Sequence, residues 1–270
     1  MENWRLVINE PFTGAMNMAV DEAIMTAVNR GMAPPTIRFY QWNPPAISLG
    51  YFQSLEKEVD LKVCRDAGID VVRRLTGGRA VLHHHELTYS LIAPEDNEKV
   101  SGSVLKSYLK ISGGLVSGLS ELGVIAKLSE GKQRSEVDSA ACFDAPSWYE
   151  MVVDGKKLIG SAQTRRSGCL LQHGSVLVKL DKDLLFSILN FPDDKLRDRA
   201  KAYFRTKATC LEEVLGRSPG FEELCQSFKR GFEAKLVINL REQGLSSEEL
   251  ALAQELNINK YGKAEWNGRK

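Results

Sequence analysis

Apolar residues recur with a helical period in two long segments of the chain. In residues 16–30 they fall on one stripe, formed by Met16, Val20, Ala23, Ile24, Ala27 and Val28. Spacings of three and four residues predict an amphipathic helix. Gly31 and the Pro34-Pro35 pair follow the stripe and end the helix. A similar stripe in residues 101–122 predicts a second helix, which we expect to cover a sheet.

Shorter apolar runs, rich in β-branched and aromatic residues, predict strands. In the first half of the chain they occupy residues 36–42, 46–52, 69–76 and 80–92. The turn signal Asn43-Pro44-Pro45 separates the first two, and a short polar helix is expected at 55–67. Strands interspersed with helices predict a mixed α/β fold.

The second half begins with a hairpin and ends in helices. Asp154-Gly155 lies between two apolar arms, and both turn residues of such a hairpin need a positive φ, which Asp and Gly tolerate. Residues 170–180 predict a further strand.

From about residue 183 the pattern becomes helical. One helix is expected to start at Ser218 and Pro219, and another at Ser246, where Glu249 completes a capping box. We therefore predict one domain over residues 1–270, in which 195–270 form a helical flank or a small C-terminal subdomain.

Composition excludes several classes of protein. Thirty-six basic and 35 acidic residues give a net charge of +1, without the basic excess expected of a general nucleic-acid binder. The first residues lack the features of a secretion signal, and no apolar run is long enough to span a membrane. A cytoplasmic protein without nucleic-acid or membrane partners is expected. The five scattered cysteines, Cys64, Cys142, Cys169, Cys210 and Cys225, are never spaced as CxxC, so neither a disulfide framework nor a zinc ribbon is expected.

The segment RRLTGGRAVLHHHELTYSLIAP, residues 73–94, contains three consecutive histidines and a glycine pair. Neighbouring residues of a strand point to opposite faces, so His83 and His85 could share a face that His84 cannot join, and no metal is expected. One inward and one exposed histidine is the simpler expectation. The glycine pair lacks the P-loop pattern and opens a strand, so it is either a tight turn or part of a pocket wall.

A reactive thiol is best placed at Cys142. It lies in SAACFDAPSWYE, an irregular stretch with small and polar neighbours, whereas Cys64 and Cys225 fall in helical patterns typical of core packing and Cys210 lies near a helix start. Lys157 follows the hairpin turn and precedes Gly160-Ser161-Ala162, so it can reach into a cleft or remain a solvated surface lysine.

Several of these stretches together resemble the lipoate-protein ligase and octanoyltransferase family. RRLTGGRAVLHHHELTYS is similar to its RRxxGGGAVxHDxxLxYS signature, and DGKKLIGSAQ is similar to its glycine-lysine hairpin. The resemblance extends from NMAVDEAI to KYGKAEWN, and CFDAPSWYE with ELTYS places the chain nearest the LipM-type branch.

The resemblance implies a biotin/lipoate-ligase-like mixed sheet with flanking helices. It also implies transfer of an octanoyl group from acyl carrier protein to a lysine of a lipoyl carrier, such as the glycine cleavage H protein, by a monomeric enzyme without cofactor or metal. Cys142 would carry the acyl group as a thioester, and the Lys157 ammonium would stabilise its thiolate and the developing oxyanion. Arg73, Gly77, Gly78 and His83 would line the acyl pocket.

The chain departs from the family pattern at two positions. His84 stands where the family usually has Asp, and Cys169 falls where the LipB-type branch places its nucleophile, which makes it the alternative thiol. The alternative functions are an ATP-dependent lipoate ligase, an amidotransferase acting between lipoyl domains, and a catalytically silent binder of acylated carriers.

Overall fold

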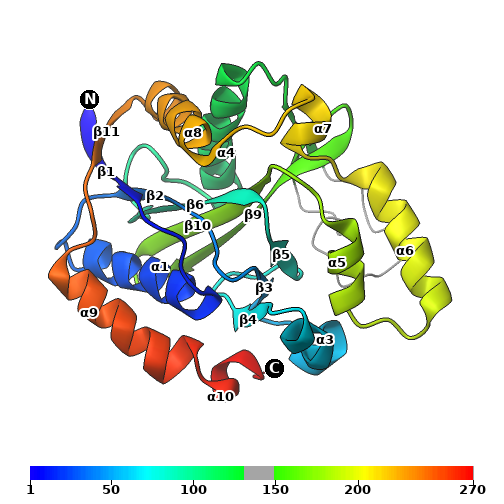
Figure 1. The fold of residues 1–270 in the computed structure, drawn as a ribbon. Helices are drawn as coiled ribbons and strands as arrows, with labels where there is room; N and C mark the ends of the chain where they lie inside the picture. Colours follow the sequence, from blue (N-terminus) through cyan, green and yellow to red (C-terminus); the bar gives the residue numbers. More distant parts are fainter. Residues whose placement is uncertain (131–148, 270) are drawn as a thin grey trace.

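The computed structural model describes residues 1–130 and 149–269, which form two sheets flanked by helices (Figure 1). The larger sheet has eight strands in the order β11-β1-β2-β6-β10-β9-β8-β7. Their bounds are β1 Glu2–Ile8, β2 Thr36–Tyr40, β6 Glu86–Pro94, β7 Lys127–Glu130, β8 Tyr149–Val153, β9 Lys156–Arg166, β10 Cys169–Leu177 and β11 Ile238–Glu242. β1 pairs in parallel with β11 and β2, while the remaining pairs are antiparallel, so the predicted mixed sheet is confirmed.

The smaller sheet has three strands in the order β4-β3-β5, with bounds β3 Ala46–Leu49, β4 Asp70–Arg73 and β5 Val81–His83. The prediction of one continuous strand over 80–92 is wrong. The chain turns at His84 and His85, where His85 has φ 50°, and passes from β5 in the small sheet to β6 in the large one. The strand breaks because its first part pairs in the small sheet and its second part pairs in the large sheet. The local alternation of apolar and polar residues does not reveal this change of partner.

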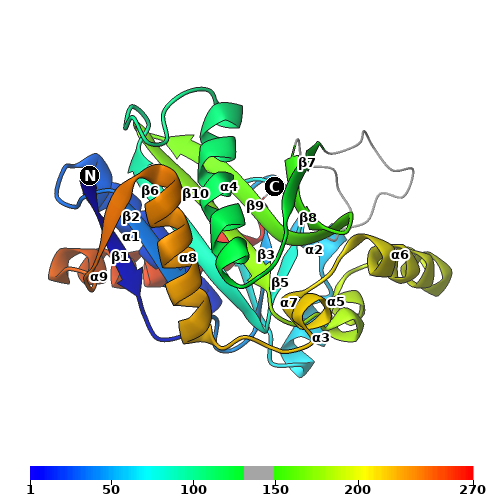
Figure 2. The same ribbon diagram turned by 90° about the horizontal axis from the view of Figure 1, so that it is seen from above.

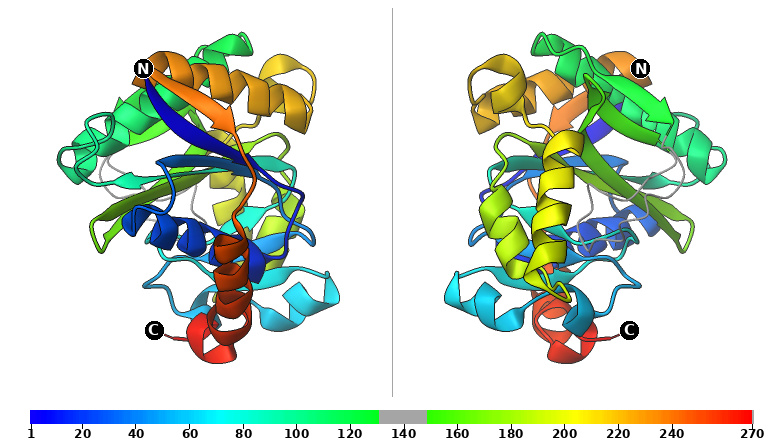
Figure 3. Two further views of the ribbon diagram at one scale, coloured as in Figure 1. Left: turned by 90° about the vertical axis from the view of Figure 1, so that its left-hand side faces the viewer. Right: turned by 90° about the vertical axis from the view of Figure 1, so that its right-hand side faces the viewer.

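Helices cover both faces of the large sheet (Figures 2 and 3). One face carries α4 (Val104–Glu121) and α8 (Phe221–Leu236), and the other carries α1 (Gly14–Asn29) and α9 (Ser247–Leu256). The two long helices predicted from periodicity are therefore confirmed, and each is capped by a hydroxyl, Thr13 for α1 and Ser103 for α4.

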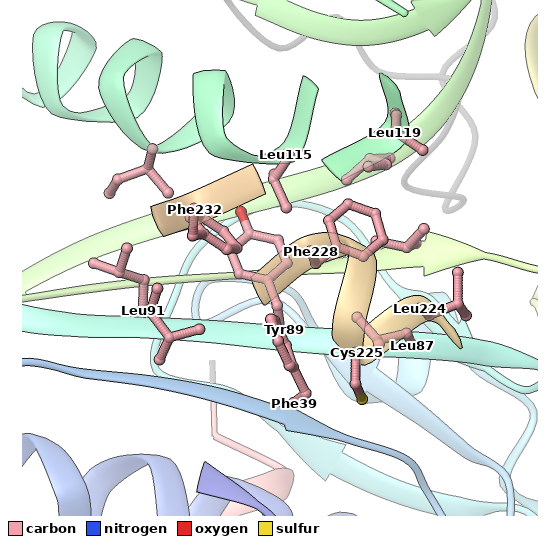
Figure 4. Close-up of a cluster of buried hydrophobic side chains, with 14 of the residues drawn as sticks. Phe39, Leu87, Tyr89, Leu91, Leu115, Leu119, Leu224, Cys225, Phe228 and Phe232 are labelled. Atoms are coloured by element: carbon pink, nitrogen blue, oxygen red, sulfur yellow. The ribbon is translucent and has the colours of Figure 1, made fainter. Parts of the chain in front are cut away.

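The layer between the sheet and the α4–α8 pair is closely packed (Figure 4). Phe228 and Phe232 of α8 lie against Gly118 and Gly114 of α4, where an added Cβ would come within 2.4 Å and 2.3 Å of the rings. Gly231 of α8 lies even closer to α4, since a Cβ added at this position would be 2.2 Å from the backbone nitrogen of Gly118. Close backbone approach of this kind requires glycine.

Helices and turns elsewhere follow the predictions with three exceptions. The capping box at Ser246 and the positive φ values of Asp154 and Gly155 are as expected. However, α8 begins after Gly220 and not at Ser218, whose hydroxyl donates to Glu212 instead. The helix predicted at 55–67 is two short helices, and the largely helical C-terminal segment also contributes β11, which was not predicted.

The remaining helices are α2 Leu55–Glu58, α3 Leu61–Asp66, α5 Lys182–Ile188, α6 Asp194–Lys207, α7 Leu211–Leu215, η1 Asn257–Tyr261 and α10 Ala264–Asn267. Among the described residues, none of the helices combines the length and the apolar character that crossing a membrane requires.

Candidate active site

A cavity of about 190 Å³ lies between the two sheets. Its walls come from β3 and β5 of the small sheet, from β9 and β10 of the large sheet, and from the loop that follows β4. Gly160 and Gly174 lie side by side in β9 and β10, and a Cβ at Gly174 would come within 2.4 Å of the Gly160 carbonyl oxygen. A side chain at Gly174 would therefore collide with the neighbouring strand, so glycine lets β9 and β10 approach closely here.

Lys157, near the start of β9, lines the cavity. Its side chain is 5% exposed, and its Nζ donates to Glu150 Oε1 at 3.2 Å. The backbone holds the residue in place because its carbonyl oxygen accepts from the Thr209 amide at 3.0 Å. A buried ammonium with a partly exposed carboxylate partner provides a positive charge in a site of low dielectric constant, where it acts strongly on a developing anion.

His83, at the end of β5, lies at the centre of a buried polar chain. Its Nδ1 is 2.7 Å from Glu86 Oε1, and its Nε2 is 2.8 Å from Ser48 Oγ. The Trp42 ring stacks on the imidazole at 4.0 Å between centroids. With Glu86 ionised, the carboxylate can only accept, so Nδ1 carries the hydrogen and Nε2 accepts from the Ser48 hydroxyl.

Arg74 connects these hydrogen-bonded groups around His83 to a second set around His173. Its guanidinium donates to Ser48 Oγ at 3.0 Å and to Thr76 Oγ1 at 3.1 Å. Thr76 Oγ1 is 2.7 Å from Nε2 of His173, whose Nδ1 is 3.5 Å from a carboxylate oxygen of Asp21. Two hydroxyl–imidazole–carboxylate relays therefore extend from one arginine.

Charges around the second relay favour a neutral imidazole and an ionised carboxylate. Burial lowers the pKa of His173 below its ordinary value, although the hydrogen bond with Asp21 opposes this effect. Burial alone would raise the pKa of Asp21, but its hydrogen bond with His173 and the Arg38 guanidinium, 2.8 Å away, together lower that pKa below its ordinary value.

The residues expected to line an acyl pocket divide into two groups. Gly78, with φ +95°, and His83 line the cavity together with Lys157. Gly77 does not line it, but its carbonyl oxygen accepts from Arg74 at 2.8 Å. Arg73 also lies outside the lining, where its guanidinium donates to backbone carbonyl oxygens including those of Gly50, Gln53 and Asn267.

The two candidate thiols differ in what the structure describes. Cys142 lies outside the described residues. Cys169, at the start of β10, is buried and does not line the cavity. It shares a strand face with His173, yet it lies four residues away, roughly 13 Å along a strand. Burial raises the pKa of its thiol to about 11, with a smaller contribution from Glu95, so the unreactive thiol form dominates at neutral pH.

The other cysteines and the histidine run match their predicted surroundings. Cys64, Cys210 and Cys225 are buried. His83 is buried, whereas His85 is exposed and its ring lies 3.6 Å from that of His84. Within residues 1–130 and 149–269, no group of three or more His, Cys, Asp or Glu side chains is arranged to hold a metal ion.

Sequence reasoning did not single out Ser48, Arg74, His173 or Asp21. Arg74 directly follows Arg73, the last residue of β4, and it is Arg74 that lines the cavity. Asp21 and His173 are far apart in sequence, and no local pattern connects them.

These features are accompanied by a clear family relationship. The chain belongs to the family described as the Lipoyl protein ligase A/B catalytic domain, whose model matches residues 13–233. It is an acyltransferase of this family, as its signature motifs predicted.

Two full-length relatives and one solved structure define the similarity. Octanoyltransferase LipM of Brevibacillus brevis is 47% identical over 100% of both chains. Octanoyltransferase LipM of Kyrpidia tusciae is 48% identical, also over 100% of both chains. A bipartite lipoate protein ligase from Thermoplasma acidophilum, whose structure was analysed with its E2 lipoyl domain, is 30% identical, with a TM-score of 0.84 over 100% of this chain and 99% of the other. The predicted fold is thus confirmed.

Proposed function

We propose that the protein moves an octanoyl group from acyl carrier protein to a lysine of a lipoyl carrier such as the glycine cleavage H protein. The observation that carries this proposal is the buried Lys157 ammonium in the wall of the cavity, in a chain whose relatives over the full length are octanoyltransferases. Each methylene that the cavity removes from water adds about 0.8 kcal/mol to acyl binding.

The chemistry runs in two steps with Cys142 as the relay. Its thiolate attacks the thioester carbonyl, a new carbon–sulfur bond forms, and the bond to the carrier's sulfur breaks, so that the carrier's thiol leaves with a proton. The acceptor lysine amine then attacks the Cys142 thioester, forms the amide, loses its proton and regenerates the thiol. Lys157 stabilises the thiolate and the oxyanion of each tetrahedral intermediate.

The pocket roles proposed for Gly78 and His83 are supported by their place in the cavity lining. Arg73 supports the site indirectly, because it organises the backbone around Gly50 and Gln53 next to the glycine loop. The raised pKa of Cys169 and its distance from the lining support Cys142 over Cys169 as the acyl-carrying thiol.

Mass spectrometry after incubation with octanoyl-acyl carrier protein tests the proposal. The wild-type protein is expected to carry a transient octanoyl adduct on Cys142, which disappears when a lipoyl carrier is added. Cys142→Ser should abolish transfer to the carrier, with Cys64→Ser as the control cysteine substitution. Transfer that survives Cys142→Ser contradicts the proposal.

Similarity to the Thermoplasma acidophilum ligase favours one second candidate, an ATP-dependent lipoate ligase. Such an enzyme activates the free acid as an acyl-adenylate and does not need Cys142. Formation of acylated carrier from lipoate only in the presence of ATP, unaffected by Cys142→Ser, would favour the ligase over the transferase.

A further inference from the structure

Ser48, His83 and Glu86 have the arrangement of a serine nucleophile, its base and the carboxylate that orients the base. The hydroxyl is 2.8 Å from Nε2, and Nδ1 is 2.7 Å from Glu86 Oε1. A nucleophile and base within hydrogen-bond reach, with the base oriented by a third group, define this catalytic pattern. The transfer reaction proposed above makes no use of Ser48.

Neighbouring groups fix the direction of each hydrogen bond. Glu86 Oε1 also accepts from the Thr88 hydroxyl at 2.5 Å and the Ser175 hydroxyl at 3.0 Å. A carboxylate oxygen surrounded by donors keeps the hydrogen of His83 on Nδ1, and the stacked Trp42 ring restricts rotation of the imidazole. The lone pair of Nε2 therefore points to the Ser48 hydroxyl.

Positive charge is available where the reaction would need it. Nη1 of Arg74 lies 3.0 Å from Ser48 Oγ and also donates to the Ser48 carbonyl oxygen at 2.9 Å. A fixed guanidinium at this distance stabilises negative charge on Oγ as its proton leaves. The imidazolium that forms in the same step is balanced by Glu86.

The second relay, through Thr76, His173 and Asp21, provides an internal comparison. It starts from the same arginine and contains the same three kinds of group, but Thr76 does not line the cavity, whereas Ser48 does. Its imidazole–carboxylate distance is also longer, 3.5 Å against 2.7 Å. Of these two relays, only the one that begins at Ser48 has its hydroxyl-bearing residue in the lining of the cavity.

We propose that Ser48 is a second acyl-accepting nucleophile and that the protein hydrolyses small acyl esters and thioesters. Ser48 Oγ attacks the carbonyl carbon while its proton passes to His83 Nε2, and the leaving alcohol or thiol takes that proton as the ester or thioester bond breaks. Water then attacks the O-acylserine with His83 as base, which releases the carboxylic acid and restores Ser48. The cavity of about 190 Å³ would hold the acyl group of the substrate.

A serine-directed alkyl fluorophosphonate, followed by peptide mass spectrometry of the wild-type protein, tests this directly. The expected adduct is on Ser48, and its rate of formation should fall by about 100-fold or more in Glu86→Gln, because the base loses its orienting charge. Ser90→Ala is the matched control, since Ser90 is a buried serine that donates to a carboxylate, Asp21, outside the cavity lining. Absence of an adduct on Ser48, or labelling that does not respond to Glu86→Gln, overturns the proposal.

Hydrolysis of p-nitrophenyl butyrate separates this site from the proposed transferase. In Cys142→Ala, turnover of the ester is expected to continue, and the further change Ser48→Ala should remove it. Turnover that persists without Ser48, or that disappears with Cys142 alone, contradicts the Ser48 proposal and leaves the Cys142 proposal to its own test. If Ser48→Ala fails to fold, the adduct site mapped on the wild-type protein decides.

Discussion

The two faces of the large sheet perform different tasks with neighbouring residues. On β6, Tyr89 packs in the apolar layer under α8, whereas Thr88 and Ser90, one residue to either side, bond to Glu86 and Asp21 on the face toward α1. On the α8 face, the backbones of α4 and α8 are in close contact at Gly231 and Gly118. The α1 face contains the cavity, which is surrounded by ion pairs and hydrogen bonds. One strand can support both because its side chains alternate between the faces. The closest helix packing and the candidate site thus lie on opposite faces of a single sheet.

Gly231→Leu tests the closed face and should have the largest effect. A Cβ at this position meets the Gly118 nitrogen at 2.2 Å and the Gly114 carbonyl oxygen at 2.6 Å, so α4 and α8 must move apart. We expect a loss of about 3 kcal/mol or more in the free energy of unfolding, measured by denaturant titration. Gly244→Leu, where no atom lies within 4 Å of the added Cβ, is the matched control and should change stability far less.

Lys157→Met tests the open face. Removing the ammonium while keeping side-chain length should lower the rate of octanoyl transfer about 100-fold, the usual cost of losing one oxyanion-stabilising group. Transfer assays alongside thermal unfolding would separate this from a folding defect. Lys156→Met, one residue away on the same strand, is the control. Equal activity of the Lys157 variant and the wild-type protein would remove Lys157 from the proposed mechanism.

The polar relays should make the open face sensitive to pH. Burial holds the pKa of His173 below its unfolded value of about 6.5. Below pH 6.5 the unfolded chain therefore binds more protons than the folded protein. The stability contributed by neutral His173 is therefore present above pH 6.5 and is lost as the pH falls through the lowered pKa. Thermal unfolding between pH 7.5 and pH 5 should show a smaller loss of stability in His173→Gln than in the wild-type protein.

Cys169→Ala should have the smallest effect, with octanoyl transfer within about twofold of wild type. With a pKa of about 11, roughly one Cys169 thiol in a thousand is ionised at pH 8. Iodoacetamide should therefore modify Cys169 slowly in the folded protein and faster as the pH rises toward 11, with the denatured chain as the reference for full reactivity. A folded Cys169→Ala variant without transfer activity would move the acyl-carrying role to Cys169.

Sequence predicted the elements whose signals are local and missed what depends on pairing at a distance. Four features follow from residues that are close together in the sequence, and all four are observed. They are the apolar stripes of α1 and α4, the Asp154-Gly155 turn and the Ser246 cap. The break between β5 and β6 and the strand β11 depend on which sheet accepts each segment, so periodicity could not reveal them.

The candidate site shows the same division. The family motif led to Gly78, His83 and Lys157, which line the cavity. It could not show that Arg74 lines the cavity and Arg73 does not, because both arginines belong to the motif and only the fold distinguishes them. Ser48 and Glu86 become meaningful only when folding brings β3 and β6 next to the same imidazole.

The pairing of β1 with β11 has a consequence for how the protein is made. β1 is synthesised long before its neighbour β11, because all the other strands of the large sheet lie between them in the sequence. Until then, the nascent chain exposes an unpaired strand edge that other chains could pair with. This edge of β1 is therefore closed only after β11 has been synthesised.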